Sequence, residues 1–324
     1  MNKFFKLKNI ILQIFFLSIL LFHNPSMSME KIHQARILSN YFSGVIALDD
    51  NRYEESYNFL KQIENLESQH SNYSKVFIQS LINNSKFNEA FRYANLLNKK
   101  KINFYQSDII TITKFIKNEE YKKAHDYIIS LDEEAYNNLE NLVYQVTLNW
   151  VKIEKFKLNY SEAQEVFKSL SNRYRNIKKI NNVFLNCYFD MTNTEESFEK
   201  LINDEQTDFS RYTFFYVNYL LKKESFDQAN TILNKKLQEI PRNLLLKQLK
   251  IDMRSTKQNH LKNNFNCKNI SNIVAELFYI TSNALSSQFL YSYSNFYLHL
   301  AKYLNQDFFS YNTLLAENFM MIEN

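Results

Sequence analysis

Few of the side chains that commonly catalyse reactions or bind metals recur at a useful spacing in this sequence. Cys187 and Cys267 are the only thiols, and there is no C-x-x-C pair. A chain with one glycine cannot contain a dinucleotide-binding fingerprint, a phosphate-binding loop or a nucleophile elbow, and Gly44 does not follow the carboxylates of an EF-hand loop. We therefore predict no catalytic residue, metal site or cofactor. The histidines are scattered and form no H-E-x-x-H pair: His23, His33, His70, His125, His260 and His299.

Paired carboxylates and aromatic residues are abundant, but each has a structural explanation. Glu54-Glu55 and Glu195-Glu196 fall where acids suit the beginning of a helix. The aromatic residues, 16% of the chain, follow a repeat register that suits a core rather than base stacking. We therefore predict no nucleic-acid partner.

The two cysteines are open to two interpretations. An oxidising compartment would allow one disulfide between them. They lie 80 residues apart and belong to no recognisable spacing motif. We therefore favour two separate, buried cysteines that pack as small apolar side chains.

Residues 1–28 resemble a secretory leader. Lys3, Lys6 and Lys8 precede an apolar run at 10–22 that is shorter than the roughly 20 residues needed to span a bilayer. Small residues at 26 and 28 precede a cleavage point before Met29. Cleavage would leave 36 basic and 34 acidic residues, lowering the formal charge from +5 to +2, which is too balanced to attract nucleic acid. The alternative is an uncleaved membrane anchor.

A short pattern recurs along the rest of the chain: an aromatic residue, two polar residues, then a small residue. Its first three copies are 34 residues apart, and later steps are 39, 34, 32 and 65 residues. A period of 34 is typical of stacked helical hairpins, in which the small residue allows two helices to approach closely. A further apolar position follows four residues after each small one. The pairs are Tyr53/Ser56, Phe87/Ala90, Tyr121/Ala124, Tyr160/Ala163, Phe226/Ala229 and Tyr291/Ser294, with Thr194/Ser197 as a variant.

These residues give the sequence a resemblance to exported bacterial tetratricopeptide repeat (TPR) proteins over most of residues 35–324. The resemblance implies an all-α fold, a right-handed superhelix (solenoid) of stacked hairpins. Gly44, the only glycine, falls at the position where the first helix of a unit packs most closely on the second. We therefore expect Gly44 to be a packing residue, not a turn residue.

The resemblance also implies a concave groove lined by the first helix of each unit. Amides there would bind a peptide backbone, and lysines would meet carboxylates. The partial match to a carboxylate clamp is too weak for that assignment. The implied groove residues are Asn72, Lys75, Gln79, Asn83, Thr113, Lys117, Lys152, Asn186, Asn218 and Lys222.

The register divides the chain into four segments. These are a signal peptide at 1–28, about six TPR units at 29–243, a degenerate joint at 244–270 and C-terminal units at 271–324. A longer loop is expected around 132–139. The last unit lacks its second helix, so we expect either a fragment of a longer protein or a chain that a partner completes.

The sequence therefore predicts a non-enzymatic protein-interaction or scaffold protein of the periplasm or cell envelope. Its partner would be a protein or peptide, with membrane contact only through an uncleaved leader. Two alternatives stay open: a membrane-tethered envelope assembly factor, and the superhelical part of a lytic-transglycosylase-like enzyme without its catalytic domain.

Overall fold

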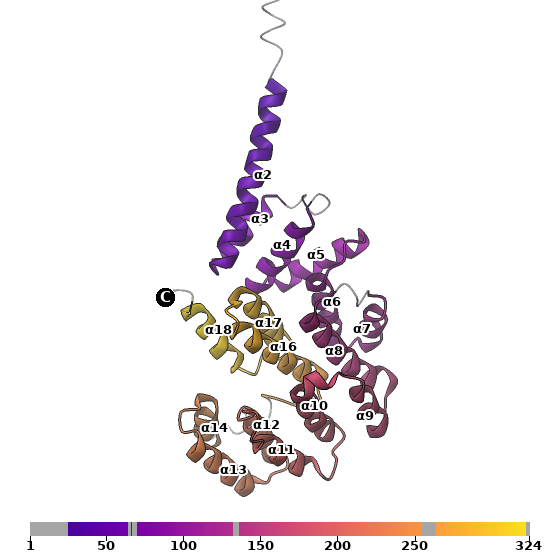
Figure 1. Ribbon diagram of the computed structural model, residues 1–324, viewed down its shortest axis with the longest axis vertical. Helices are drawn as coiled ribbons and strands as arrows, with labels where there is room; N and C mark the ends of the chain where they lie inside the picture. The colour runs from indigo at the N-terminus through magenta and orange to yellow at the C-terminus, as the bar shows by residue number, and fades with distance from the viewer. Residues whose placement is uncertain (1–24, 64–65, 67–69, 132–135, 255–263, 322–324) are drawn as a thin grey trace, which may run out of the picture. The chain divides into compact units, whose positions relative to one another are not determined.

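All regular secondary structure described by the computed structural model is helical (Figure 1). The structure describes residues 25–63, 66, 70–131, 136–254 and 264–321, and these include no strand. The chain divides into two compact units, Met1–Phe77 and Ile78–Asn324. The boundary falls within α4 (Ser71–Asn83). The all-α class predicted from the low glycine content is confirmed.

Helices that follow one another along the chain pack together. In the first unit α2 (Pro25–Asp49) packs against α3 (Tyr53–Lys61). In the second unit each helix from α5 to α14 packs against the next, which gives a repeat-like arrangement. These helices are α5 (Phe87–Lys99), α6 (Tyr105–Lys117), α7 (Tyr121–Ile128), α8 (Asn138–Phe156), α9 (Tyr160–Lys168), α10 (Arg175–Tyr188), α11 (Thr194–Ile202), α12 (Tyr212–Lys222), α13 (Phe226–Glu239) and α14 (Leu244–Arg254).

The 34-residue register correctly places the first residue of every second helix in the predicted pairs. These helices begin at Tyr53, Phe87, Tyr121, Tyr160, Thr194, Phe226 and Tyr291. The small residues of the pattern are fully buried at six positions, as close helix packing requires: Ser56, Ala90, Ala124, Ala163, Ala229 and Ser294. The aromatic positions are less uniform. Phe226 is 42% exposed, so at that step the aromatic residue begins a helix without filling the core.

The turns between paired helices explain how the chain manages without glycine. One to three positions after the end of each first helix, one residue adopts a positive φ angle, which usually favours glycine. Here side chains that are not glycine take that position. Two backbone hydrogen bonds close such a turn, as from Glu224 N–H to Leu221 O at 3.2 Å and from Ser225 N–H to Leu220 O at 2.9 Å. The left-handed residues are Asn51, Ser85, Glu119, Lys157, Asp190, Glu224 and Phe289, together with Lys101 between α5 and α6.

Gly44 lies at the crossing of α2 and α3, where the sequence places it. Its φ angle is not positive, so its backbone conformation does not require glycine. A Cβ atom at Gly44 would lie 2.6 Å from Leu60 Cγ and 2.7 Å from Leu60 Cδ2. Ser56 Oγ donates a hydrogen bond of 2.8 Å to Gly44 O across the same crossing. Gly44 is therefore a packing residue.

We expect Gly44→Ala to destabilise the α2–α3 pair by about 1 kcal/mol, because overpacking outweighs the gain in helix propensity. In a Leu60→Ala background, which lacks the clashing atoms, Gly44→Ala should instead stabilise the pair by roughly the propensity difference. Amide hydrogen exchange over residues 41–63 would measure both effects. If Gly44→Ala changed the stability in the same direction with and without Leu60→Ala, the packing explanation would be contradicted.

The last helices of the chain lie among the earlier ones in the second unit. α16 (Ile270–Ser286) and α17 (Tyr291–Leu304) form a tightly packed pair, which α18 (Tyr311–Met320) follows. We call α16 and α17 the C-terminal hairpin. The hairpin packs against α6 and α8, although more than 100 residues separate them in sequence (Figure 1). Tyr297 OH donates a hydrogen bond of 2.9 Å to Tyr105 OH at this contact.

Two long-range links fasten the hairpin. A disulfide joins Cys187, at the end of α10, to Cys267, three residues before α16. The favoured sequence interpretation, two unpaired cysteines, is therefore wrong. Arg211 forms an ion pair with Glu276 of α16, with Nε to Oε1 at 2.7 Å and Nη2 to Oε2 at 2.8 Å. The carboxylate of Glu276 is fully buried.

Several of the predicted segments fall partly outside the described residues. Residues 1–24 of the expected leader and the middle third of the expected joint, at 255–263, lie outside the described residues. Residues 132–135 of the expected longer loop also lie outside them. α14 occupies the first part of the joint, and 271–324 share one compact unit with 78–254. None of the described helices is both long and apolar enough to cross a membrane.

Candidate functional site

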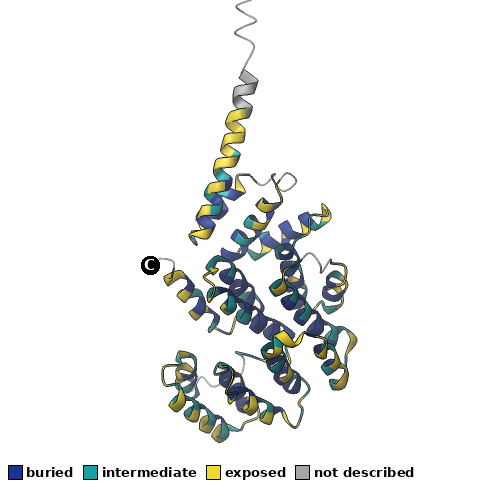
Figure 2. Cartoon of the chain, viewed as in Figure 1, coloured by how far each residue is buried: buried dark blue, intermediate teal, exposed yellow. Residues whose placement is uncertain are grey.

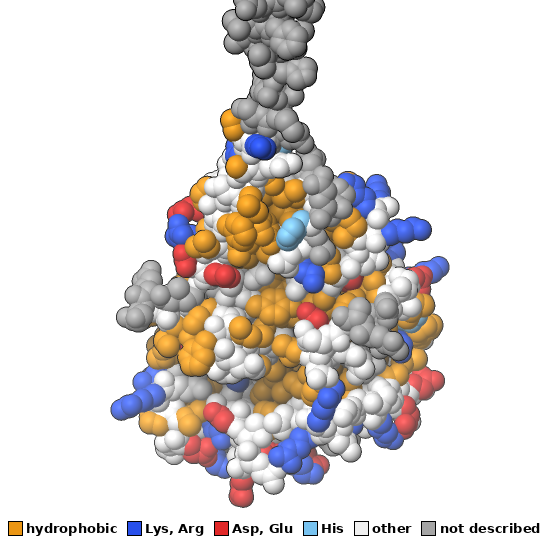
Figure 3. All heavy atoms as spheres, turned by 45° about the horizontal axis from the view of Figure 1, so that its top comes forward, with side chains coloured by type: hydrophobic (Ala, Val, Ile, Leu, Met, Phe, Trp, Pro, Cys, Tyr) orange, Lys and Arg blue, Asp and Glu red, His pale blue; other side chains and the backbone are white. Residues whose placement is uncertain are grey.

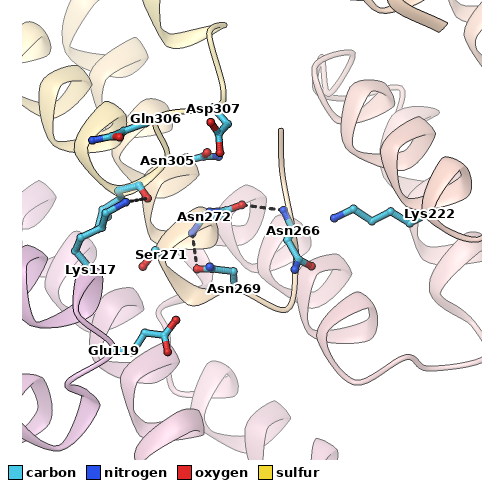
Figure 4. A pocket seen from close by; sticks show the side chains of 11 residues that line it. Lys117, Glu119, Lys222, Asn266, Asn269, Ser271, Asn272, Asn305, Gln306 and Asp307 are labelled. Carbon is cyan, nitrogen blue, oxygen red and sulfur yellow. Dashed lines mark hydrogen bonds between the residues drawn. The ribbon is translucent and has the colours of Figure 1, made fainter. Parts of the chain in front are cut away.

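A polar pocket of about 470 Å³ opens in the second unit where several helix ends meet (Figure 4). α6 and α12 contribute their last residues, Lys117 and Lys222. The hairpin contributes the beginning of α16 and the end of α17. The pocket is lined by Lys117, Glu119, Lys222, Asn266, Asn269, Ser271, Asn272, Leu304, Asn305, Gln306 and Asp307.

The two lysines of the pocket are held by backbone carbonyls. Lys117 Nζ donates a hydrogen bond of 3.2 Å to Leu304 O, in the last turn of α17. Lys222 Nζ donates one of 2.6 Å to Phe265 O, two residues from the disulfide. A lysine ammonium has three donors, so each of these bonds leaves further donors for a ligand.

Lys222 is exposed by surface area, yet its surroundings remove enough water to lower its pKa to about 8. The ammonium still meets solvent and donates to a carbonyl, so Lys222 stays mostly charged at pH 7.

Asparagines organise the part of the pocket between the two lysines (Figure 4). Asn269 caps the N-terminus of α16, and its side chain accepts a hydrogen bond from Asn272 N–H. Asn272 Oδ1 in turn accepts a hydrogen bond of 2.8 Å from Asn266 N–H (Figure 4). Asn305 Nδ2 donates one of 2.9 Å to Asn264 O. These bonds fix the segment before α16 between the ends of α12 and α17.

The pocket offers donors and acceptors together. Lys117 and Lys222 supply positive charge, and Glu119 and Asp307 supply the same amount of negative charge. A balanced site is not suited to a free multivalent anion. The alternating N–H and C=O groups of a peptide, together with one polar or carboxylate side chain, would match these groups better.

The structure brings four of the predicted groove residues to the C-terminal hairpin or to the segment before it. Gln79 Nε2 donates a hydrogen bond of 2.9 Å to Ser292 Oγ, and Asn83 Nδ2 donates one of 3.1 Å to Ser292 O. Lys117 and Lys222 make the contacts described above. The polar groups predicted to receive a partner therefore meet the chain's own last helices over part of their length.

Other predicted groove residues are bound locally. Thr113 Oγ1 donates to Ile109 O in its own helix, and Asn186 Oδ1 accepts from Tyr160 OH at 2.6 Å. In the first unit Asn72 Nδ2 donates to Tyr41 OH at 3.2 Å, and Lys75 is exposed. Lys152 is half-buried.

Asn218 differs from the rest of the predicted groove set. Its side chain is 1% exposed, and neither its Nδ2 nor its Oδ1 has a hydrogen-bond partner among the described residues. Burying an amide without partners is costly.

No sequence pattern predicts that the hairpin residues belong to this region. The pairing of Arg211 with Glu276 is also not predicted, although Glu276 interrupts an apolar stretch and Arg211 directly precedes one. A charged residue inside an apolar run favours a buried ion pair, and this was the available signal. The pairing of the cysteines carried no further local signal beyond their number.

His299 is a buried histidine of the hairpin that no sequence pattern singled out. It is 7% exposed, its Nδ1 lies 3.2 Å from Ser85 Oγ, and its Nε2 has no partner in the described part of the chain. Burial, with a smaller contribution from Lys302, lowers the pKa of His299 from 6.5 to about 4. The folded state therefore holds this imidazole neutral.

We expect acid to weaken the folding of the second unit through His299. Between pH 6.5 and 4 the unfolded chain binds a proton at this site that the folded chain does not. Stability should therefore fall as the pH is lowered through this window, by at most roughly 3 kcal/mol. Urea unfolding from pH 7 to pH 4 would show a shallower loss for His299→Gln than for the wild type. Equal slopes would contradict a neutral, buried imidazole.

The described residues contain no group of three or more His, Cys, Asp or Glu side chains that could hold a metal ion. No protein-family model matches the chain, and no curated protein is significantly similar to it.

Proposed function

We propose that this chain is an exported, non-enzymatic protein-interaction protein, built as a TPR-type right-handed superhelix. The repeat register supports the architecture, because every predicted second helix begins at the predicted residue. The disulfide supports the location, because disulfides persist in oxidising compartments such as the bacterial periplasm. The basic and apolar character of residues 1–28 agrees with export.

The polar pocket is the observation that carries the binding function. It joins two of the predicted groove lysines with the beginning of α16, and it remains open although the hairpin covers Gln79 and Asn83. We place the docking of a partner's peptide segment in this pocket. Lys117 and Lys222 would contact a carboxylate of the peptide, and the asparagines would contact its backbone.

Peptide binding to purified variants tests this proposal. The probe is an array of short peptides with acidic or neutral side chains, each with a free or an amidated C-terminus. We expect Lys117→Glu with Lys222→Glu to weaken binding of acidic peptides at least tenfold. Lys200→Glu is the matched control, because Lys200 is exposed on α11 and does not line the pocket.

A double Lys→Arg variant should keep most of the affinity, since it keeps the charge. Binding that is unchanged in the Lys117→Glu, Lys222→Glu variant would move the docking site away from the pocket. No binding of any peptide by the wild type would contradict the pocket as a peptide site.

A further inference from the structure

α2 carries apolar residues on two separate faces. One face is buried in the first unit and includes Tyr41, Gly44 and Leu48. The other face is exposed, and much of the part of α2 whose burial is described is accordingly yellow in Figure 2. The exposed large residues of this second face are Ile32, Leu38, Phe42 and Ile46, with exposures of 65%, 56%, 54% and 56%.

The exposed residues form a stripe because their spacing matches the helix. Leu38, Phe42 and Ile46 follow one another at four-residue intervals, so they lie on one side of α2. Figure 3 shows hydrophobic side chains gathered on this part of the molecular surface. A stripe of large apolar side chains on a helix is a typical surface for a second helix.

Two opposite charges mark the ends of the stripe. Lys31 and Asp49 are 18 residues apart, which corresponds to about five turns, so they lie in line on the helix. Both are exposed, and neither has a hydrogen-bond or ion-pair partner in the described part of the chain. Partial burial and the nearby Asp50 raise the pKa of Asp49, so this carboxylate would gain from a cation.

The positions of these residues are symmetric about Asn40. Residues 31 and 49 are equally distant from 40, and so are 38 and 42. If a second α2 helix packs antiparallel to the first and the two cross at the level of Asn40, Leu38 of each copy lies against Phe42 of the other. This arrangement would also place Lys31 against Asp49 of the other copy at both ends. A parallel copy would instead bring Asp49 against Asp49, which is repulsive.

We propose that the exposed stripe of α2 is a self-association surface, and that its occupant is the α2 helix of a second copy in antiparallel orientation. The interface is isologous, since the same patch serves both copies. The apolar centre supplies the binding energy, and the two Lys31–Asp49 pairs select the orientation. This surface lies in the first unit and does not depend on the peptide pocket.

Sedimentation of the purified chain and its variants tests the interface. Wild type and variants are prepared identically, so residues 1–28 affect all of them in the same way. We expect a dimer for the wild type and at least a 100-fold weaker self-association for Phe42→Glu. Leu38→Glu should behave like Phe42→Glu, and Lys200→Glu, a charge change on α11, should remain dimeric. Circular dichroism confirms that the exposed substitutions leave the helices intact.

A charge exchange tests the orientation. Lys31→Glu and Asp49→Lys should each weaken the dimer several-fold, and the double variant should restore it. Mixing Leu38→Cys with Phe42→Cys chains should give a mixed disulfide-linked dimer, which a parallel pair would not favour. A monomeric wild type, a dimer insensitive to Phe42→Glu, or no rescue by the double variant would overturn the proposal. Loss of vesicle binding by Phe42→Glu in a monomeric protein would assign the stripe to a lipid surface and also overturn it.

Discussion

Replacing Glu276 by leucine is expected to destabilise the second unit by about 3–5 kcal/mol, because it leaves the guanidinium of Arg211, whose side chain is only 17% exposed, without its counter-charge. Arg211 Cζ lies 3.5 Å from the centre of the Tyr279 ring, and its Nη1 donates a hydrogen bond of 2.9 Å to Ser310 Oγ. These contacts hold the guanidinium beside the position of Glu276. Urea unfolding would measure the loss.

The double variant Arg211→Met with Glu276→Leu is the decisive comparison. Replacing both members of a buried ion pair by apolar residues of similar size is often neutral or stabilising. We therefore expect the double variant to recover most of the stability that either single variant loses. The exposed pair Lys200–Glu196 serves as control, and its removal should cost less than about 0.5 kcal/mol. A loss below about 1 kcal/mol for Glu276→Leu would show that the pair is not desolvated.

The variant Arg211→Met alone should show a characteristic pH dependence. Burial raises the pKa of Glu276, and Arg211 opposes this effect. Without Arg211, the folded chain binds a proton at Glu276 more tightly than the unfolded chain does. The variant should therefore be least destabilised below pH 4.5, and stability should be lost as the pH rises above that value.

Removing the disulfide should have an effect of similar size. Cys187 and Cys267 close a loop across a sequence separation of 80 residues, and the described chain contains no free cysteine. The chain-entropy model assigns about 4–5 kcal/mol to a loop of this length. We therefore expect Cys187→Ser with Cys267→Ser to lower the free energy of unfolding by several kcal/mol, within the roughly 2–5 kcal/mol typical of native disulfides.

Without the disulfide, the loss of stability should begin in the C-terminal hairpin before it affects the whole second unit. Cys267 stands at the entrance to the C-terminal hairpin, so its release should first free residues 264–320 from α6, α8 and α10. Hydrogen exchange should therefore accelerate more in α16 and α17 than in α7 and α9. Each single Cys→Ser variant should resemble the double variant. A wild-type protein with two titratable thiols under non-reducing conditions would contradict the disulfide itself.

The sequence by itself determined the local architecture. The repeat of Tyr53, Phe87 and Tyr121 at 34-residue intervals set the beginnings of the second helices. The position of Gly44 in that register set a close helix crossing, and the structure has it against Leu60. These features depend on helix periodicity and on the packing of neighbours in sequence, so a local pattern is sufficient to specify them.

Only the tertiary structure decided what the inward faces of the helices meet. A glutamine or lysine on a helix face has the same local pattern whether it receives a partner or the chain's own hairpin, and Gln79 and Lys117 meet the hairpin. The pairing of Cys187 with Cys267, and of Arg211 with Glu276, joins residues separated by 80 and 65 positions. Such contacts arise where buried charge and apolar surface must be satisfied across the whole unit, and no local periodicity encodes them.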